Sequence, residues 1–345
     1  MGMERKQRVT HRDVARLANV STAVVSYVVN NGPRQASPEA RERVLRAIAE
    51  LGYHPNAFAQ SLRGQRTHMI GFITNDLFPY DVFLSPYSAG ILTGLISELK
   101  AHEHYLLIYP QVIGEDIAPL NRLLRSGRLD GVVVRLIQDP PVTDSLMETI
   151  AATDVPCVCI ERPAAERFGF KAVTYDDALG ATTATRYLIE HGHRRIAHLC
   201  GDVQYATAQS RLQGYRQALY AAGLPVDEQL IQGDTWDTSQ VADSMLRLLA
   251  LAEPPTAIFA ASDNLALGAL EQLRKQGFEV PRDMALIGFD DIQLAEQSSP
   301  PLTTVRIPLA ELGRQAADRV LRLSADDQAP ESVTLPVELI RRGTV

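Results

Sequence analysis

From residue 67 onward, short apolar runs alternate with segments of helical length, and this alternation constrains the fold more than any other feature. The runs are 69–74, 104–109, 131–137, 155–160, 171–176, 195–200, 256–261 and 284–289. Strands that alternate with helices predict parallel sheets covered by helices. The runs divide into two successive sets of four, so we expect two similar α/β lobes. A crevice between such lobes, at the carboxyl ends of the strands, is the expected small-ligand site.

Residues 9–52 follow a different pattern and read as three short helices. Ser21 and Ser37 are expected to cap the second and third helices, and Gly52 to end the third. Residues 1–66 hold 11 Lys and Arg against 5 Asp and Glu, whereas the rest of the chain holds 23 against 36. A basic segment on an acidic body points to a polyanion partner for that segment, although a solvated basic face without a partner also explains the charge.

The first two helices fit a helix-turn-helix. Asn19 falls in the turn, where the left-handed backbone is one that asparagine tolerates. The first helix is expected to pack through Val14, Ala15 and Leu17. The second is expected to turn inward the valines Val20, Val24, Val25, Val28 and Val29. Its outward face then shows Thr22, Ala23, Ser26 and Tyr27, at the helix N-terminus where recognition helices meet base edges.

This N-terminal pattern resembles the LacI/GalR family of bacterial transcription regulators. The strongest match is T-x-x-D-V-A-x-x-A-x-V-S-x-x-x-V-S-x-V-V-N over 10–30, followed by LGYHPNAFAQSLR over 51–63. Further matches follow in order: YLIEHGHRRIAHLCG, SRLQGY, ASDNLALGAL, LIGFDD and PPLTTVR. The resemblance covers nearly the whole chain. It implies an N-terminal all-α helix-turn-helix domain and a two-lobed α/β domain with parallel sheets, like that of periplasmic sugar-binding proteins.

The resemblance implies a helix-turn-helix domain at 1–53, a hinge helix or linker at 54–66, and an effector-binding and dimerisation domain at 67–345. It further implies a homodimer that places each second helix in the major groove of a near-palindromic double-stranded DNA operator. The implied DNA-contacting residues are Thr10, Ser21, Thr22, Ala23, Ser26, Tyr27, Asn30, Tyr53, Asn56, Ala59, Leu62 and Arg63.

Two of these positions have alternative interpretations. Leu62 matches the leucine with which the family kinks the minor groove, or it is a buried leucine of the linker. Tyr27 stands where the family often has an arginine that reads guanine. Because tyrosine cannot make that bidentate contact, Tyr27 meets a sugar, a phosphate or one base edge, or else only packs against the third helix. The operator sequence is therefore not transferable from better-known members.

The resemblance also implies an effector pocket between the lobes. The matching positions are Tyr205, Thr207, Arg211, Trp236, Ser262, Asp263 and Asp290, with Tyr87 as a weaker match. Arg211 and Asp290 would make charge-assisted hydrogen bonds, and Trp236 would offer a flat apolar face. Asp290 has an alternative role in capping the next turn, and Trp236 in the core. These residue types suit a sugar or a sugar phosphate, and a purine less well.

The sequence lacks the motifs that are typical of other classes of protein. The sequence has no Walker A loop, no G-x-S-x-G and no G-x-G-x-x-G after a first strand, so we expect neither an enzyme nor a cofactor. The histidines of HGHRR have unsuitable spacing and basic neighbours, and the cysteines lie in apolar runs, so we expect no metal site. No run reaches the ~20 apolar residues of a membrane span, and no secretory signal is found. We expect a cytoplasmic repressor, nucleoid-associated when bound to DNA, whose effector acts either as inducer or as corepressor.

Overall fold

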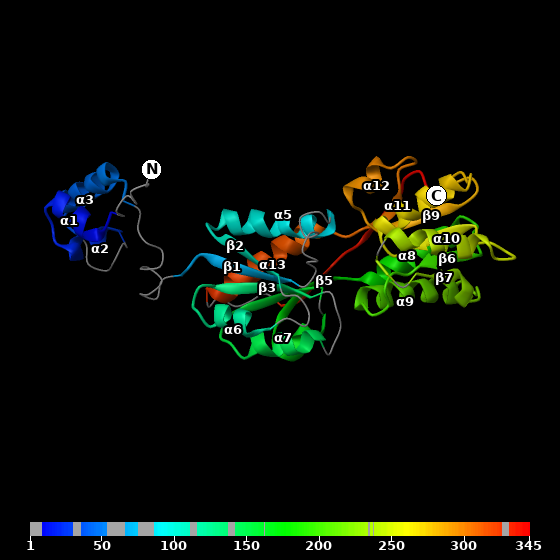
Figure 1. Ribbon diagram of the computed structural model, residues 1–345, viewed down its shortest axis with the longest axis horizontal. Helices are drawn as coiled ribbons and strands as arrows, with labels where there is room; N and C mark the ends of the chain where they lie inside the picture. The colour runs from blue at the N-terminus through cyan, green and yellow to red at the C-terminus, as the bar shows by residue number, and fades with distance from the viewer. Residues whose placement is uncertain are drawn as a thin grey trace, which may run out of the picture. The chain divides into compact units, whose positions relative to one another are not determined.

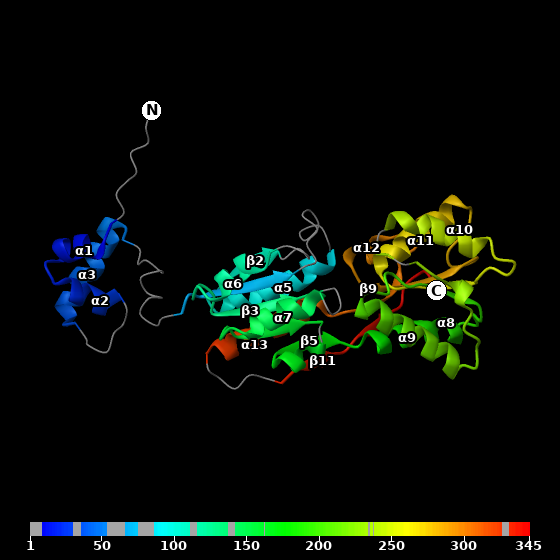
Figure 2. The ribbon, with the colours of Figure 1, turned by 60° about the horizontal axis from the view of Figure 1, so that its bottom comes forward.

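The computed structural model describes residues 9–29, 36–53, 66–74, 86–110, 116–136, 142–161, 163–233, 235–236, 238–325 and 331–345. The chain divides into two compact units, Met1–Thr67 and His68–Val345. Figures 1 and 2 show them from two directions, coloured along the chain from blue to red.

The first unit is helical, with α1 (His11–Ala18), α2 (Thr22–Val29) and α3 (Pro38–Leu51) (Figure 1). Val14, Val25 and Val44, one from each helix, are fully buried at its centre. β-Branched valines are weak helix formers, so packing against this shared core holds the short α2 in place.

The predicted ends of these helices are confirmed. Asn19 has φ 50° and ψ 54°, the left-handed conformation expected of the turn, and Gly52 has φ 58° after α3. The Ser37 hydroxyl accepts a hydrogen bond from the Ala40 N–H at 3.3 Å. The expectation for Leu17 is wrong, because this side chain is 44% exposed. The buried face of α1 is centred on Val14, Ala15 and Ala18, which leaves position 17 at its edge.

The second unit contains two lobes, each built on a six-stranded sheet. In lobe 1 the strand order is β11-β5-β4-β3-β1-β2, and every pair is parallel. Its strands are β1 (Met69–Thr74), β2 (Tyr105–Pro110), β3 (Gly131–Arg135), β4 (Cys157–Ile160), β5 (Lys171–Tyr175) and β11 (Val333–Leu335). Its helices are α5 (Pro86–Ala101), α6 (Ala118–Leu124), α7 (Val142–Ala151), η1 (Pro163–Phe168) and α13 (Leu309–Ser324).

Lobe 2 repeats this order as β12-β10-β9-β8-β6-β7, with β12 antiparallel to β10 and the other pairs parallel. Its strands are β6 (Ile196–Leu199), β7 (Ile231–Gln232), β8 (Ala257–Ala260), β9 (Ala285–Asp290), β10 (Thr303–Arg306) and β12 (Glu338–Ile340). Its helical segments are α8 (Asp177–Glu190), α9 (Ala206–Ala221), η2 (Glu228–Leu230), η3 (Thr238–Gln240), α10 (Val241–Leu249), α11 (Asp263–Lys275) and α12 (Gln293–Gln297).

Two α/β lobes with parallel sheets are confirmed, and all eight predicted strands are present. One assignment is wrong: the run at 171–176 belongs to the first set of strands, because β5 pairs with β4 and β11 in lobe 1. The short strands β7, β10, β11 and β12 were not predicted. The chain crosses between the lobes three times, after β5, after β10 and after β11.

In both lobes, two helices meet at glycines. In lobe 1, a Cβ on Gly94 of α5 would lie 1.7 Å from the carbonyl oxygen of Ala310 in α13. In lobe 2, a Cβ on Gly214 of α9 would lie 2.3 Å from the carbonyl oxygen of Ala178 in α8. Both distances are far below van der Waals contact, so only glycine permits these helices to approach so closely.

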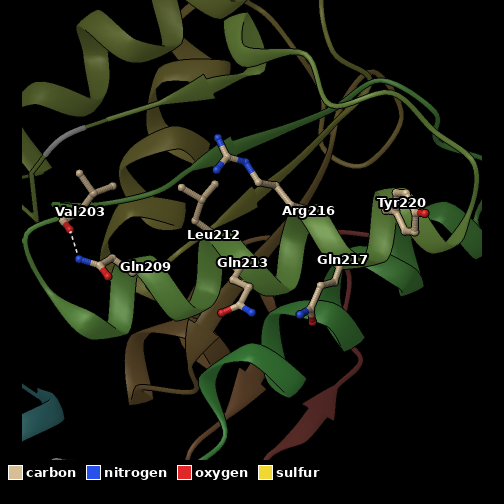
Figure 3. Close-up of a pocket in the computed structure, with 7 residues that line it drawn as sticks. All are labelled: Val203, Gln209, Leu212, Gln213, Arg216, Gln217 and Tyr220. Carbon is tan, nitrogen blue, oxygen red and sulfur yellow. Dashed lines mark hydrogen bonds between the residues drawn. The ribbon is translucent and has the colours of Figure 1, made fainter.

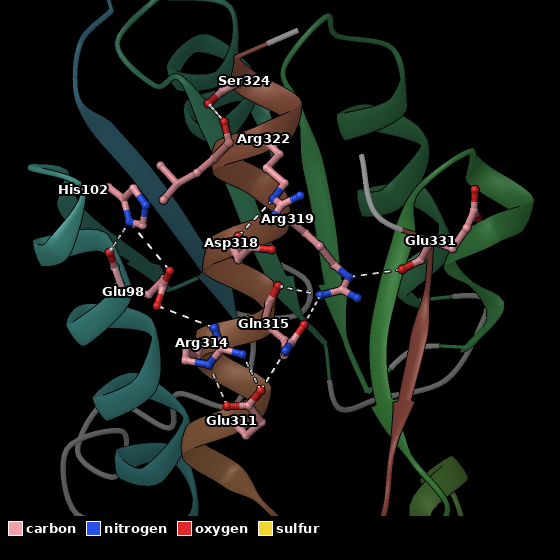
Figure 4. Close-up of polar contacts among 11 residues, drawn as sticks. Glu98, His102, Glu311, Arg314, Gln315, Asp318, Arg319, Arg322, Ser324 and Glu331 are labelled. Carbon is pink, nitrogen blue, oxygen red and sulfur yellow. Dashed lines mark hydrogen bonds and ion pairs between the residues drawn. The ribbon is translucent and has the colours of Figure 1, made fainter. Parts of the chain in front are cut away.

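Ion pairs line the exposed side of the α5–α13 contact (Figure 4). Arg314 lies 2.6 Å from Glu311 on α13 and 3.8 Å from Glu98 on α5. Arg319 donates from Nε to the carbonyl oxygen of Glu331 at 3.2 Å, which ties α13 to the segment that leads into β11. These contacts help to fix α13, a late segment of the chain, within the lobe that the early segments form.

Candidate functional site

The outward face of α2 carries small polar side chains. Thr22 and Ala23 are exposed in its first turn, whereas Ser26 and Tyr27 are half-buried. Ser21 precedes the helix, and its hydroxyl accepts from the Val24 N–H at 3.4 Å, a weak N-cap. The first turn of α2 therefore offers short exposed side chains, which suits an approach to base edges.

Thr10 and Tyr53 have structural contacts in this unit. The Thr10 backbone N–H and hydroxyl both donate to Asp13, at 2.9 and 2.7 Å, and these bonds lower the pKa of that carboxyl group. Tyr53 is only 8% exposed, lies in the core and has its ring 5.4 Å from that of His11. The burial of Tyr53 speaks against its expected contact with DNA. Asn30, Asn56, Ala59, Leu62 and Arg63 lie outside the described residues.

A second group of polar residues gathers where strands of both lobes end. Lobe 1 contributes Arg135 at the end of β3, Glu161 after β4, Tyr175 at the end of β5, and Tyr87 from α5. Arg135 donates from Nε to Glu161 at 2.8 Å. The Tyr87 hydroxyl donates to the other oxygen of Glu161 and lies 2.9 Å from the Tyr175 hydroxyl. Lobe 1 therefore presents a buried ion pair flanked by two phenols.

Lobe 2 contributes Asp177 from α8, Arg211 from α9 and Asp290 at the end of β9. Arg211 donates from Nε to Asp177 at 2.6 Å and from Nη1 to Asp290 at 3.4 Å. It also donates to the carbonyl oxygen of Ala261, and its guanidinium carbon lies 3.9 Å from the ring centroid of Phe289. These contacts hold the guanidinium group in one orientation.

The two halves meet at Tyr175. Its hydroxyl accepts from Nη2 of Arg211 at 3.1 Å and lies against Tyr87 on its other side. We call the resulting set the interlobe cluster. It consists of Tyr87, Arg135, Glu161, Tyr175, Asp177, Arg211 and Asp290.

The interlobe cluster holds more carboxylates than guanidinium groups, and its side chains are mostly buried. Burial raises the pKa of Asp177 to about 6 and that of Asp290 to about 7, in both cases against the opposing effect of Arg211. Burial also raises the pKa of Tyr87 and Tyr175 well above the ordinary value for a phenol. Both tyrosines are therefore protonated at neutral pH and are able to donate hydrogen bonds.

The structure brings Tyr87, Arg211 and Asp290 together among the expected effector residues, but Ser262 and Asp263 serve the fold. The Ser262 hydroxyl accepts from the Leu265 N–H at the start of α11. Asp263 is fully buried and accepts from the Ile292 N–H at 2.8 Å and from the Thr304 hydroxyl at 2.5 Å. With both carboxylate oxygens engaged inside lobe 2, Asp263 is poorly placed to contact a ligand.

Trp236 lies near the end of β6. A Cβ on Gly201, which has φ 65°, would lie 2.8 Å from the Trp236 ring, so the indole covers this glycine. Tyr205 meets Trp236 edge to face with ring centroids 6.3 Å apart. Tyr205 and Thr207 are half-exposed at the start of α9, one helical turn and more before Arg211.

Four members of the interlobe cluster were not predicted: Arg135, Glu161, Tyr175 and Asp177. Each lies at or just beyond the end of a buried apolar strand, in VVVR, CVCIE and AVTYDD. In parallel sheets, the carboxyl ends of strands converge on one edge. The first polar residue after each apolar run would therefore have identified Arg135 and Glu161, and a search of the residues around the end of β5 would have included Tyr175 and Asp177.

A separate groove of about 550 Å³ runs along the exposed face of α9 (Figure 3). Its lining residues are Val203, Gln209, Leu212, Gln213, Arg216, Gln217 and Tyr220. Arg216 pairs with Glu228 at 2.8 Å, and Gln209 donates to the carbonyl oxygen of Val203 at 2.8 Å. None of the expected site residues lines this groove.

Within the described ranges, no group of three or more His, Cys, Asp or Glu side chains is arranged to hold a metal ion. The helices in the same ranges are all too short or too polar to cross a membrane.

Family models match two parts of the chain. Residues 10–56 match the model of bacterial regulatory proteins of the lacI family, and residues 185–345 match that of a periplasmic binding protein-like domain. The chain is 38% identical over 347 residues to the HTH-type transcriptional regulator CelR of Thermobifida fusca, covering 99% of each protein.

Solved structures resemble the chain over almost its full length. One is a transcriptional regulator CelR–cellobiose complex, with a TM-score of 0.72, 34% identity, and coverage of 98% of this chain and 100% of that one. Another is the lac repressor dimer bound to operator and the anti-inducer ONPF, with a TM-score of 0.84, 26% identity, and coverage of 98% and 99%.

Proposed function

The chain belongs to the lacI family of bacterial regulatory proteins, and from this membership we propose that it represses transcription as a homodimer on a near-palindromic DNA operator. It is a DNA-binding transcription regulator, as its relatives are. Repression and dimerisation are supported by the lac repressor, which was solved as a dimer on its operator. In this proposal the protein acts in the cytoplasm, where bacterial DNA lies, and has no catalytic activity. A repressor that binds an operator accounts for the basic N-terminal unit and the acidic body.

In this proposal, α2 enters the major groove and reads base edges with Thr22, Ala23, Ser26 and Tyr27. The exposure of Thr22 and Ala23 in the first turn supports this assignment. Thr10 and Ser21 are assigned to the phosphates because they lie at the N-terminal ends of α1 and α2. Asn30 and the hinge residues Asn56, Ala59, Leu62 and Arg63 complete the set. Tyr53 is left out because it is buried.

The effector is proposed to be a sugar or a sugar derivative bound at the interlobe cluster, with Trp236 and Tyr205 beside it. The observation that carries this proposal is the hydrogen bond from Arg211, which also contacts Asp290, to Tyr175 of lobe 1 at the strand ends. Buried charged pairs with phenolic hydroxyls match the donors and acceptors of a sugar ring. The cellobiose complex of a relative supports the same class of ligand.

Effector and operator binding are proposed to be coupled through the three crossovers between the lobes. A ligand that bridges both halves of the interlobe cluster favours one relative arrangement of the lobes, and the dimer transmits this change to the spacing of the two DNA-binding units. The coupling is reciprocal, so operator DNA must change effector affinity by the same factor that effector changes operator affinity.

The decisive experiment is selection of bound duplexes from a random DNA pool with the purified full-length protein at moderate salt. A palindromic consensus with half-sites about one helical turn apart is expected. Thr22→Val keeps the shape of the side chain and removes its hydroxyl, and each lost base contact should cost about 1–3 kcal/mol at a single base pair. Leu17→Ala, at an exposed position on α1, is the control. A consensus without two-fold symmetry would contradict the proposal.

Sedimentation at micromolar protein concentration tests the dimer directly. A single species of twice the 37.9 kDa chain mass is expected. A monomer or a stable tetramer would contradict the proposed assembly.

A further inference from the structure

The charges of the interlobe cluster indicate more about the ligand than that it is a sugar or a sugar derivative. The cluster contains two guanidinium groups, those of Arg135 and Arg211, and three carboxyl groups, those of Glu161, Asp177 and Asp290. Each arginine is paired at a short distance: 2.8 Å for Arg135 and Glu161, and 2.6 Å for Arg211 and Asp177. The side chains of these two pairs are all at least 87% buried.

Four of the five N–H donors of Arg211 are committed within the protein. Its nitrogen atoms donate to Asp177, Asp290, the carbonyl oxygen of Ala261 and the hydroxyl of Tyr175, and one face of the guanidinium plane lies over Phe289. A phosphate or carboxylate group needs guanidinium donors that point toward it, as in a bidentate pair. To provide them here, Arg211 would have to leave a buried carboxylate without its partner, which is costly.

The carboxyl groups themselves oppose a further negative charge. Burial disfavours the negative charges of Asp290 and Asp177, and it raises the pKa of both groups toward neutrality. An anionic group placed beside them adds repulsion in a region of low dielectric constant. The hydroxyl groups of a neutral sugar, in contrast, donate to carboxylates and accept from guanidinium or phenol groups without changing the net charge.

We propose that the interlobe cluster selects an uncharged polyhydroxy ligand and rejects one that carries a phosphate or carboxylate group. This inference rests on the proposed effector site and narrows its ligand, because the residue types predicted from the sequence suit a sugar or a sugar phosphate. Glu161 is the key residue, since it neutralises Arg135 from the lobe 1 side. Removing Glu161 takes away a carboxylate that pairs with Arg135 and should let this guanidinium group bind an anion.

The test uses inorganic phosphate as the probe, with the full-length protein. The melting temperature is measured in 10 mM phosphate and in sodium chloride of the same ionic strength, for the wild type and for Glu161→Gln. Phosphate is expected to shift the wild type no more than chloride does, and to raise the melting temperature of Glu161→Gln by about 2 °C or more if phosphate at that level is several times its dissociation constant. The basic N-terminal unit is present in both proteins, so its own phosphate binding cancels in the comparison.

Glu148→Gln, which removes an exposed carboxylate on α7 of the same lobe, is the matched control and should behave as the wild type does. If Glu161→Gln does not fold, Asp290→Asn serves in its place, because it releases a partner of Arg211. A wild type that is stabilised by phosphate, with the effect lost in Arg135→Gln, overturns the proposal. The absence of a phosphate effect in every folded variant also overturns it, because the carboxylates would then not be what excludes anions.

Calorimetric titration with matched ligands gives a second readout. Cellobiose is compared with cellobionate, and ribose with ribose 5-phosphate. The neutral member of any pair that binds should bind at least about tenfold more tightly than the charged member. Tighter binding of the charged member contradicts the charge selection. Operator binding is measured in parallel on the same protein, so failure of the proposed regulator function is visible separately.

Discussion

Lobe 1 and lobe 2 share a strand order and a glycine-mediated helix pair, but they hold their charged groups differently. In lobe 2, Arg211 is fixed by two carboxylates, a backbone carbonyl and an aromatic ring, and Asp263 anchors the backbone that follows β9. In lobe 1, Arg135 and Glu161 form an ion pair, and Tyr87 of α5 donates to Glu161 and lies against the guanidinium group of Arg135. The contacts described above thus tie the lobe 2 half of the site to the backbone of its sheet, and join the lobe 1 half through side chains.

The largest effect should come from filling the helix contacts. Gly94→Ala in lobe 1 forces a methyl group onto the backbone of α13 and is expected to reduce the free energy of unfolding by about 3–4 kcal/mol. Gly214→Ala in lobe 2, with a less severe overlap, should cost about 2–3 kcal/mol. Urea unfolding followed by far-UV circular dichroism reports on the whole chain, while fluorescence of Trp236, the single tryptophan, reports on lobe 2.

Gly268→Ala on α11 is the control for both variants. Its new methyl group would lie 3.4 Å from Val241, an ordinary contact, and helix propensity should make the change neutral or stabilising by up to about 1 kcal/mol. If Gly94→Ala lowered the free energy of unfolding no more than Gly268→Ala does, the two lobes would not share the same close helix packing.

The next effect tests whether lobe 2 is anchored by Asp263. Asp263→Ala leaves the buried Thr304 hydroxyl and the Ile292 N–H without their acceptor, which should cost about 3 kcal/mol in urea unfolding. Asp243→Ala removes an exposed carboxylate from α10 and should have little effect. If Asp263→Ala and Asp243→Ala lowered the free energy of unfolding equally, Asp263 would not be an anchor of lobe 2.

An effect of pH on stability, intermediate in size, should come from a buried histidine of lobe 2. His198 is fully buried between Tyr215 and Phe259, and burial lowers its pKa from 6.5 to about 4. Below pH 6.5 the unfolded chain binds a proton that the folded chain does not, so stability is lost as the pH falls toward 4. Between pH 7 and pH 5 the wild type should lose about 2 kcal/mol more than His198→Phe.

Urea unfolding at several pH values provides that measurement. Asp177 and Asp290 act with the opposite sign, because their raised pKa values add stability at low pH that is lost as the pH rises through about 6 and 7. They are unchanged in His198→Phe, so the difference between the two proteins isolates the histidine. Parallel pH profiles for both proteins would show that His198 accepts its proton inside the folded lobe.

The smallest effect should come from the residue at which the two halves meet. Tyr175→Phe removes the hydroxyl that lies between Arg211 and Tyr87, and it should cost about 1 kcal/mol of stability. Its effect on ligand affinity should be larger than its effect on stability if the ligand bridges the lobes there. Tyr220→Phe, at an exposed position on α9, is the matched control. Equal ligand affinities in the two variants would place the ligand away from Tyr175.

The sequence was sufficient to predict the two lobes, the DNA-binding helices and the ends of those helices, because these features follow from local signals. Apolar runs mark buried strands, and Asn19, Ser37 and Gly52 mark turns and caps through their own conformational preferences. The same local signals failed for Leu17, because a helix of eight residues has too few turns to define its buried face. The burial of Tyr53 was not predictable from them either, since whether an aromatic residue after a helix packs or protrudes depends on the neighbouring helices.

The interlobe cluster was only partly predictable for a related reason. Arg211 and Asp290 stand in family motifs, whereas Arg135, Glu161 and Tyr175 are marked only by their position after apolar strands. The assignment of β5 to the wrong lobe separated Tyr175 from the lobe 1 residues it contacts. Which strands share a sheet depends on pairing across the chain, as between Val158 and Lys171 in β4 and β5, and no local pattern carries that information.

The three crossovers also set an order for events on the ribosome. Lobe 1 begins with β1 but lacks α13 and β11 until residue 335 has been made, about 160 residues after β5. At about 5–20 residues per second, the glycine face of α5 and the edge of β5 wait on the order of ten seconds for their partners. All of lobe 2 except β12 is synthesised in that interval. Lobe 1, whose synthesis starts first, is therefore completed only after most of lobe 2 has been made. A nascent chain stalled before α13 exposes the α5 surface to chaperones and proteases.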